Sequence, residues 1–121
     1  MLDTALLLAL LGFEIKRALL NNTLKGFLKG GIYENYIAET LIKRGHTLHY
    51  FKPNDNLELE FIIEKDGKVI PLEVKVGYTI TKSLDSFIND FNLSMAIKLI
   101  NGNASKVQNK YTISHFLVMF I

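Results

Sequence analysis

The chain has 121 residues, of which 49% are hydrophobic and 21% are charged, a composition typical of one folded domain rather than of a disordered chain. It contains no cysteine. This excludes zinc ribbons, iron–sulfur clusters, thiol catalysis and a disulfide-stapled scaffold, and it makes a reducing compartment, the cytoplasm, the expected location. Fourteen lysine and arginine residues against twelve acidic residues give a formal net charge of +2, which permits a polyanionic partner without requiring one.

The N-terminal residues predict a helix over 3–20 that is interrupted near Gly12 and capped by Asp3 or Thr4. Its apolar run, residues 5–11, is far shorter than the ~20 apolar residues that span a bilayer. The run also lacks the basic residues and the cleavage site of a signal peptide, so we expect a buried helix and no membrane segment. Because leucine surrounds this helix on nearly all sides, we expect it to pack against a second chain or a missing neighbour, which favours a homo-oligomer.

The rest of the chain predicts an α/β core in the order helix, three strands, helix, strand. Gly45 stands where a glycine commonly ends a helix, and Ser83 is a candidate helix cap. The predicted elements are a loop at 21–31, a helix at 32–44, strands at 47–51, 57–63, 69–76 and 95–100, a helix that follows Ser83, a loop at 101–106 and a strand or short helix at 116–121. We therefore divide the chain into an N-terminal helical segment, 1–30, that packs on the core or a partner, and a core, 31–121.

Asp66 and Gly67, between the second and third predicted strands, are the strongest short hairpin signal in the chain. As the central residues of a tight turn, they place Lys65 opposite Lys68 and set the register of the hairpin. Simple alternation in the second strand predicts two faces: Leu57, Leu59, Phe61 and Ile63 on one, and Glu58, Glu60 and Ile62 on the other.

The same register places Glu60 directly opposite Glu73 and Glu58 opposite Lys75, with all four side chains on one face. Two opposed carboxylates, with Cβ atoms ~5 Å apart, repel each other unless something positive lies between them. A hard divalent cation such as Mg²⁺ is one solution, because it binds one or two carboxylates and keeps several waters. A β-bulge would shift the register by one residue and remove the opposition.

Glu34 adds a third carboxylate from the helix at 32–44. At about 100° per residue, it lies in the middle of the apolar stripe that contains Ile37, Ala38 and Leu41. An ionised group that faces the core needs a partner, and Lys75 or a metal-bound water would serve.

Several segments at consistent spacing resemble a known family. Glu34, Glu60 and Glu73-Val74-Lys75, in this element order, look like the core of the PD-(D/E)XK nucleases, the restriction-endonuclease-like fold. More closely, the chain resembles the domain of unknown function that lies C-terminal to the ATPase domain in many bacterial and archaeal AAA-type ATPases. The matching segments are 2–7 (LDTALL, similar to the family's "DxGLL"), 33–38 (YENYIA, "ENxVA"), 58–62 (ELEFI, "EVDFI") and 70–75 (IPLEVK, "IPIEVK").

This resemblance implies a magnesium- or manganese-dependent nuclease that acts on DNA. Glu60, Glu73 and the Val74 carbonyl would hold the metal, Lys75 would orient the attacking water, and Glu34 would order a metal-bound water or a second cation. Basic residues at the rim, such as Lys43, Arg44, Lys52 and Lys82, would contact phosphates. The chain departs from the family in two places, with Glu60 where the family has aspartate and Val76 where it often has a small polar residue.

The chain contains no G-x-x-x-x-G-K-[ST] phosphate loop, so it is not itself the ATPase. It looks like the C-terminal piece of such a protein, whose ATPase domain or second copy would meet the leucine-rich helix. Two other interpretations stay open. The acidic hairpin face is simply solvated, with Glu58 and Lys75 as a cross-strand ion pair, or the domain is a degenerate regulatory module that binds nucleic acid or protein. His46, His49 and His115 show no metal-ligand spacing and are expected to be ordinary loop and strand residues.

Overall fold

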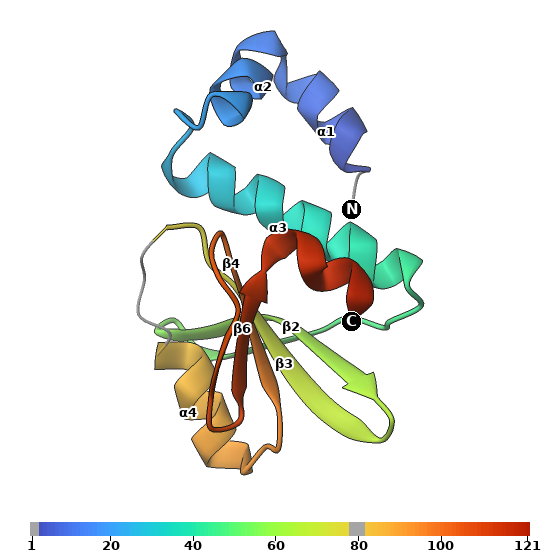
Figure 1. The fold of residues 1–121 in the computed structure, drawn as a ribbon, viewed down its shortest axis with the longest axis vertical. Helices are drawn as coiled ribbons and strands as arrows, with labels where there is room; N and C mark the ends of the chain where they lie inside the picture. The colour runs from blue at the N-terminus through green and yellow to red at the C-terminus, as the bar shows by residue number, and fades with distance from the viewer. Residues whose placement is uncertain (1–2, 78–81) are drawn as a thin grey trace.

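Six strands form one mixed sheet that helices cover on both faces (Figure 1). The computed structural model describes residues 3–77 and 82–121, so Met1 and Leu2 of the predicted N-terminal segment lie outside the described residues. The helices are α1 (Thr4–Leu11), α2 (Phe13–Leu20), α3 (Gly26–Lys43), α4 (Lys82–Phe91) and the 3-10 helix η1 (His115–Phe120). The strands are β1 (His49–Asn54), β2 (Leu57–Lys65), β3 (Lys68–Val74), β4 (Ala96–Ile100), β5 (Ser105–Val107) and β6 (Lys110–Ser114). The prediction of a mixed α/β fold is confirmed.

The sheet combines an antiparallel part and a parallel part, in the strand order β1-β2-β3-β4-β6-β5. Strands β1, β2 and β3 pair antiparallel, whereas β4 pairs parallel with both β3 and β6. Parallel neighbours need a crossover connection, and α4 lies in the one between β3 and β4. Helices α3 and η1 cover one face of the sheet and α4 covers the other (Figure 1). β3 is therefore an interior strand, buried between two helical layers.

Helix α3 ends as the sequence predicts but begins earlier. Gly45 has a φ of 91°, its N–H donates to the Ile42 carbonyl, and the N–H of His46 donates to the Leu41 carbonyl, which together form a Schellman motif. The predicted loop at 21–31 is wrong from Gly26 onward, because these residues form the first turns of α3. Glycine disfavours a helix by only about 1 kcal/mol, which tertiary packing of the same helix offsets. The predicted boundary after residue 30 falls inside α3.

The β2–β3 hairpin has the predicted turn and, over most of its length, the predicted register. Asp66 and Gly67 both have positive φ, 53° and 73°, as a type I′ turn requires. The two strands pair from Lys65 opposite Lys68 to Phe61 opposite Leu72. The register prediction is confirmed for these pairs, and the pairing ends one residue before Glu60.

A β-bulge in β2 overturns the predicted alternation. His49 of β1 pairs with Ile62 of β2, and Phe51 pairs with Leu59. Between these two pairs β1 advances by two residues and β2 by three, so β2 carries one extra residue there. Accordingly, Leu59 packs with the α4 cluster, whereas Phe61 packs with the α3 cluster. The prediction that Leu59 and Phe61 share a face is wrong, and Glu60 lies at the switch.

The C-terminal third holds elements that the sequence did not predict. Strand β5 begins within the predicted loop at 101–106, and β6 was not predicted at all. The segment at 116–121, whose type was left open, is mostly the 3-10 helix η1. Ser83 is not a helix cap, because it lies inside α4.

The N-terminal helices α1 and α2 form a hairpin on the outer side of α3, away from the sheet (Figure 1). Asp3 caps α1 as predicted, since its carboxylate accepts the N–H groups of Ala5 and Leu6 at 2.9 and 3.2 Å. The backbone N–H and hydroxyl of Thr4 donate to Glu39 of α3 at 2.8 and 2.6 Å. Hydrogen bonds from Lys43 and Thr4 lower the pKa of Glu39 to about 2. Glu39 is therefore ionised at neutral pH and still accepts the hydrogen bonds that hold α1 against α3.

Large apolar side chains remain on the outside of this hairpin. Neither α1 nor α2 has a buried residue, and Leu10 and Phe13 are 68% and 71% exposed. The expectation of a buried helix at residues 5–11 is therefore wrong within this chain, because α1 packs against α2 and α3 and leaves much of its apolar surface uncovered. Within the ranges 3–77 and 82–121, no helix combines the length and the apolar character needed to cross a bilayer. Exposed apolar patches of this kind are typical of protein-binding surfaces. They are consistent with the predicted partner, which stays a prediction.

We expect the isolated chain to self-associate through α1 and α2 at micromolar concentrations. Replacing Leu10 and Phe13 together by lysine should lower the mass measured by light scattering to that of a monomer, because charge on this surface opposes its burial. As a control, lysine at the exposed Val107 of β5 should leave the oligomer intact. A monomeric mass for the unmodified chain over this range would contradict the prediction.

Candidate active site

The candidate site lies at the end of β3, beyond the last register pair of β2 and β3, Phe61 opposite Leu72. Glu73, one residue before the end of β3, is only 1% exposed. Its Oε1 lies 3.4 Å from the Nζ of Lys75, and its register partner on β4 is Lys98. The side chain of Lys75 is 27% exposed, so this ion pair joins a buried carboxylate to a group that water can reach.

Glu60 approaches the same place from the bulge of β2. One carboxylate oxygen of Glu60 and one of Glu73, Oε2 in both, are buried and have no hydrogen-bond partner among the residues described. An unpartnered buried polar atom costs about 1–3 kcal/mol, and more when the group is charged. Buried polar atoms in folded proteins normally have partners, so two such atoms make this region a candidate site for a ligand, an ion or ordered water.

Electrostatics set the protonation of these two acids. Burial raises the pKa of Glu73 above its ordinary 4.5, the charge of Glu60 raises it further, and Lys75 and Lys98 act in the opposite direction. Burial also raises the pKa of Glu60, against the lowering effect of nearby backbone N–H groups and of Lys75. The charges of the two carboxylates and of Lys75 thus shift one another's protonation, and we refer to these three side chains as one electrostatic group.

Glu34 of α3 belongs to the same group. It is partly buried, as its place on the apolar stripe predicts. Burial raises its pKa, the charges of Glu60 and Glu58 raise it further, and Lys75 lowers it. The structure therefore brings Glu34, Glu60, Glu73 and Lys75 into one region, although they come from three different elements.

Glu58 does not take the predicted place opposite Lys75. It accepts a hydrogen bond from the Tyr50 hydroxyl at 3.1 Å and lies 3.7 Å from the Nζ of Lys52, both on β1. The bulge at Glu60 is the reason, because it breaks the register before Glu58. The predicted ion pair between Glu58 and Lys75 is therefore wrong, and so is the placing of all four side chains by a single unbroken register.

The backbone of Val74 lies beyond the last register pair of β2 and β3. The N–H of Lys75 donates to the Leu99 carbonyl of β4 at 2.9 Å. Since neighbouring residues of a strand direct their backbone groups to opposite sides, the N–H and carbonyl of Val74 point toward β2. The β2–β3 pairing has already ended at Leu72, so we treat this carbonyl as a candidate oxygen ligand together with Glu60 and Glu73.

These donors suit a hard divalent cation. Among residues 3–77 and 82–121, no three acidic or histidine side chains are grouped as a complete metal site. Magnesium does not need such a group, because it binds one or two carboxylates and takes its remaining ligands from water and substrate. Two carboxylates with unpartnered oxygens and an adjacent carbonyl fit that requirement.

Two residues near the site were missed in the sequence. His115 is buried, its Nε2–H donates to the Lys75 carbonyl at 2.9 Å, and its ring centre lies 4.5 Å from that of Tyr33. It therefore holds η1 against the end of β3, and the expectation of an ordinary loop or strand residue is wrong for His115, which begins η1. Lys98 lies beside Glu73 only because β4 runs parallel to β3, and no local pattern reveals that pairing. The one available signal was a lysine between Ile97 and Leu99 in an otherwise apolar strand.

The family model named "Domain of unknown function (DUF4143)" matches residues 29–116. This is most of the chain, and the protein belongs to that family. The matched range contains all four acidic and basic residues of the candidate site. Comparisons with the curated proteins and with the solved structures gave no match.

Replacing Glu73 by glutamine should stabilise the protein at pH 7. The folded-state pKa of Glu73 lies above the unfolded value near 4.5, so ionisation disfavours the folded state, with a penalty that is absent below pH 4.5 and grows as the pH rises through the folded-state pKa. We expect a gain of about 1 kcal/mol in the free energy of unfolding at pH 7, and no gain well below pH 4.5.

Urea unfolding of Glu73→Gln at several pH values measures this difference. Glu64→Gln is the matched control, because Glu64 is an exposed carboxylate on β2 and its change should leave stability nearly unaltered at every pH. A loss of stability at pH 7 in Glu73→Gln would show that the carboxylate is a structural group.

Proposed function

We propose that this chain is a nuclease-like domain with a PD-(D/E)XK core that hydrolyses DNA phosphodiester bonds with Mg²⁺ or Mn²⁺. The observation that carries the proposal is the pair of buried carboxylates, Glu60 and Glu73, with one unpartnered oxygen each and Lys75 beside them. A purely structural ion pair would not leave two acceptors without partners.

The order of elements supports the fold assignment. From α3 to β4 the chain runs helix, three strands, helix, strand, with an antiparallel hairpin next to a parallel pair. This is the order that the resemblance implies for a PD-(D/E)XK core. The candidate residues then fall on α3, on β2 and at the end of β3, with Lys75 one residue after β3.

In the proposed reaction, Glu60, Glu73 and the Val74 carbonyl hold the divalent cation. When bound, the cation polarises a phosphodiester oxygen and lowers the pKa of a water molecule. The attacking water gives up one proton, for which the Glu34 carboxylate is the acceptor, as its oxygen forms a bond to phosphorus; the bond from phosphorus to the leaving oxygen breaks, and that oxygen takes up a proton from solvent.

Lys75 and Glu34 act around this centre. The ammonium of Lys75, partly exposed next to Glu73, orients the attacking water and balances the negative charge that develops on the phosphoryl oxygens. Glu34 faces the same region from α3 and accepts a hydrogen bond from the water. Its raised pKa makes it a better proton acceptor than an exposed glutamate.

We further propose that the domain is the C-terminal piece of a cytoplasmic AAA-type ATPase. The exposed leucines of α1 and α2 would then contact the ATPase domain or a second copy of this chain.

The alternative is a catalytically degenerate regulatory module of such an ATPase, which binds nucleic acid or protein without cleavage. Glu60 favours it, because a side chain one methylene longer than aspartate loosens the geometry of the metal ligands. The exposed apolar hairpin of α1 and α2 also favours a binding role.

Titration calorimetry with Mg²⁺ and Mn²⁺, followed by a plasmid-nicking assay, separates these two functions. We expect cation binding in the unmodified chain, and a loss of nicking of about 100-fold or more in Glu73→Ala and Lys75→Ala, the size typical for removal of one group that stabilises the transition state. Glu64→Gln should nick normally. If the chain binds no cation, and if Glu73→Ala and Lys75→Ala nick the plasmid no less than the unmodified chain, the nuclease proposal is wrong and the binding module is favoured.

A further inference from the structure

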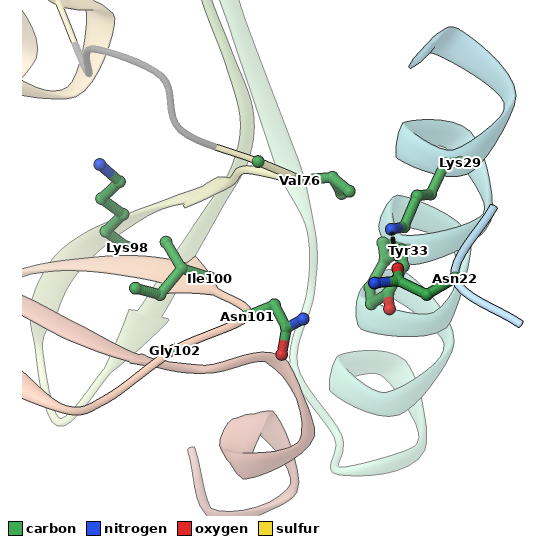
Figure 2. A pocket seen from close by; sticks show the side chains of 9 residues that line it. Asn22, Lys29, Tyr33, Val76, Lys98, Ile100, Asn101 and Gly102 are labelled. Carbon is green, nitrogen blue, oxygen red and sulfur yellow. Dashed lines mark hydrogen bonds between the residues drawn. The ribbon is translucent and has the colours of Figure 1, made fainter. Parts of the chain in front are cut away.

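A cavity of about 670 Å³ lies beside the candidate active site, between the start of α3 and the residues that end β3 and β4. Figure 2 shows Asn22, Lys29 and Tyr33 on the α3 side, and Val76, Lys98 and Asn101 on the sheet side. Its size falls within the range of ligand pockets. The carboxyl ends of parallel strands, here β3 and β4, are a usual place for such pockets in α/β sheets.

The chemistry of the lining suits an anion. Two lysines and two asparagines contribute to it, and none of the described residues that line it is acidic. The Nζ of Lys29 donates to the Oδ1 of Asn22 at 2.8 Å, a neutral partner that orients the ammonium without cancelling its charge (Figure 2). Lysine ammonium groups and side-chain amides are common ligands of phosphate oxygens.

The cavity is linked to the candidate site in two ways. Some of its lining residues follow site residues in the chain, and the charges of its two lysines act on residues of the site. Val76 and Gly77, which line it, directly follow Lys75. Lys98 is the register partner of Glu73, and its charge acts on that carboxylate. The charge of Lys29 acts on His115, which binds the Lys75 carbonyl. A ligand bound to Lys98 in the cavity would therefore lie near Glu73, although the site carboxylates are not among the described residues that line the cavity.

We propose that this cavity binds phosphate groups, with Lys29 and Lys98 as their cationic contacts, and that it holds the backbone of a nucleic-acid strand beside Glu73. This inference deepens the proposed function and rests on it, because the strand in the cavity is the strand that the carboxylates would cleave. A free mononucleotide offers the same phosphate chemistry, so the experiment distinguishes the two sources.

The test measures binding of a labelled single-stranded oligodeoxynucleotide by fluorescence anisotropy, in EDTA, so that no metal and no cleavage are needed. We expect Lys29→Gln and Lys98→Gln each to weaken binding about tenfold and to reduce the slope of log affinity against log salt by about 0.7. Lys98→Arg should restore binding, which separates lost charge from disturbed packing beside Glu73. Lys68→Gln is the matched control, because Lys68 begins β3 at its far end, and it should bind as the unmodified chain does.

Competition with dAMP identifies the source of the phosphate. A strand that binds at least tenfold more tightly than dAMP supports the proposal, whereas equal affinity overturns the assignment to a strand. No binding of either ligand, or equal weakening by Lys68→Gln, overturns the pocket itself. The proposed function fails separately, when Mg²⁺-dependent cleavage is absent while binding in EDTA persists.

Discussion

The buried carboxylate of Glu73, held 3.4 Å from the ammonium of Lys75, is the constraint around which the end of β3 is organised. Burying a negative charge disfavours folding unless a cation or strong donors compensate it. Here the compensation is partial, since one oxygen has a cation beside it and the other has no hydrogen-bond partner among the residues described. A fold selected for stability alone would place an apolar side chain at this position.

Three features of the sheet create this environment. β2 carries one extra residue at its bulge opposite β1, and its pairing with β3 ends at Phe61 and Leu72, one residue before Glu60. The parallel pairing with β4 sets Lys98 beside Glu73, and His115 of η1 holds the Lys75 carbonyl from the α3 side. Bulges often aim a side chain next to an active site, and Glu60 at this bulge has, like Glu73, one buried carboxylate oxygen without a partner among the residues described.

The features that the sequence predicted correctly depend on residues that are close together in the chain. Asp66 and Gly67 fixed the hairpin turn, Gly45 ended α3, and the apolar stripe placed Glu34 inward, because each signal acts within a few residues. The bulge at Glu60, the burial of His115 and the pairing of Lys98 with Glu73 depend on contacts between distant segments. The sequence therefore predicted the register of the hairpin near its turn but not the irregularity at Glu60, and it missed β6 because a short strand carries little periodicity.

In the proposed function, Glu73 is a buried, partly uncompensated carboxylate that binds a cation. Carbon-13 NMR titration of its carboxyl carbon, without and with Mg²⁺, measures whether burial and the cation act on this carboxylate. We predict a pKa above the ordinary 4.5 in the metal-free protein, consistent with its burial, and a lower pKa when Mg²⁺ is added, since the cation favours the ionised form. A pKa at or below 4.5 that Mg²⁺ does not change would contradict the account.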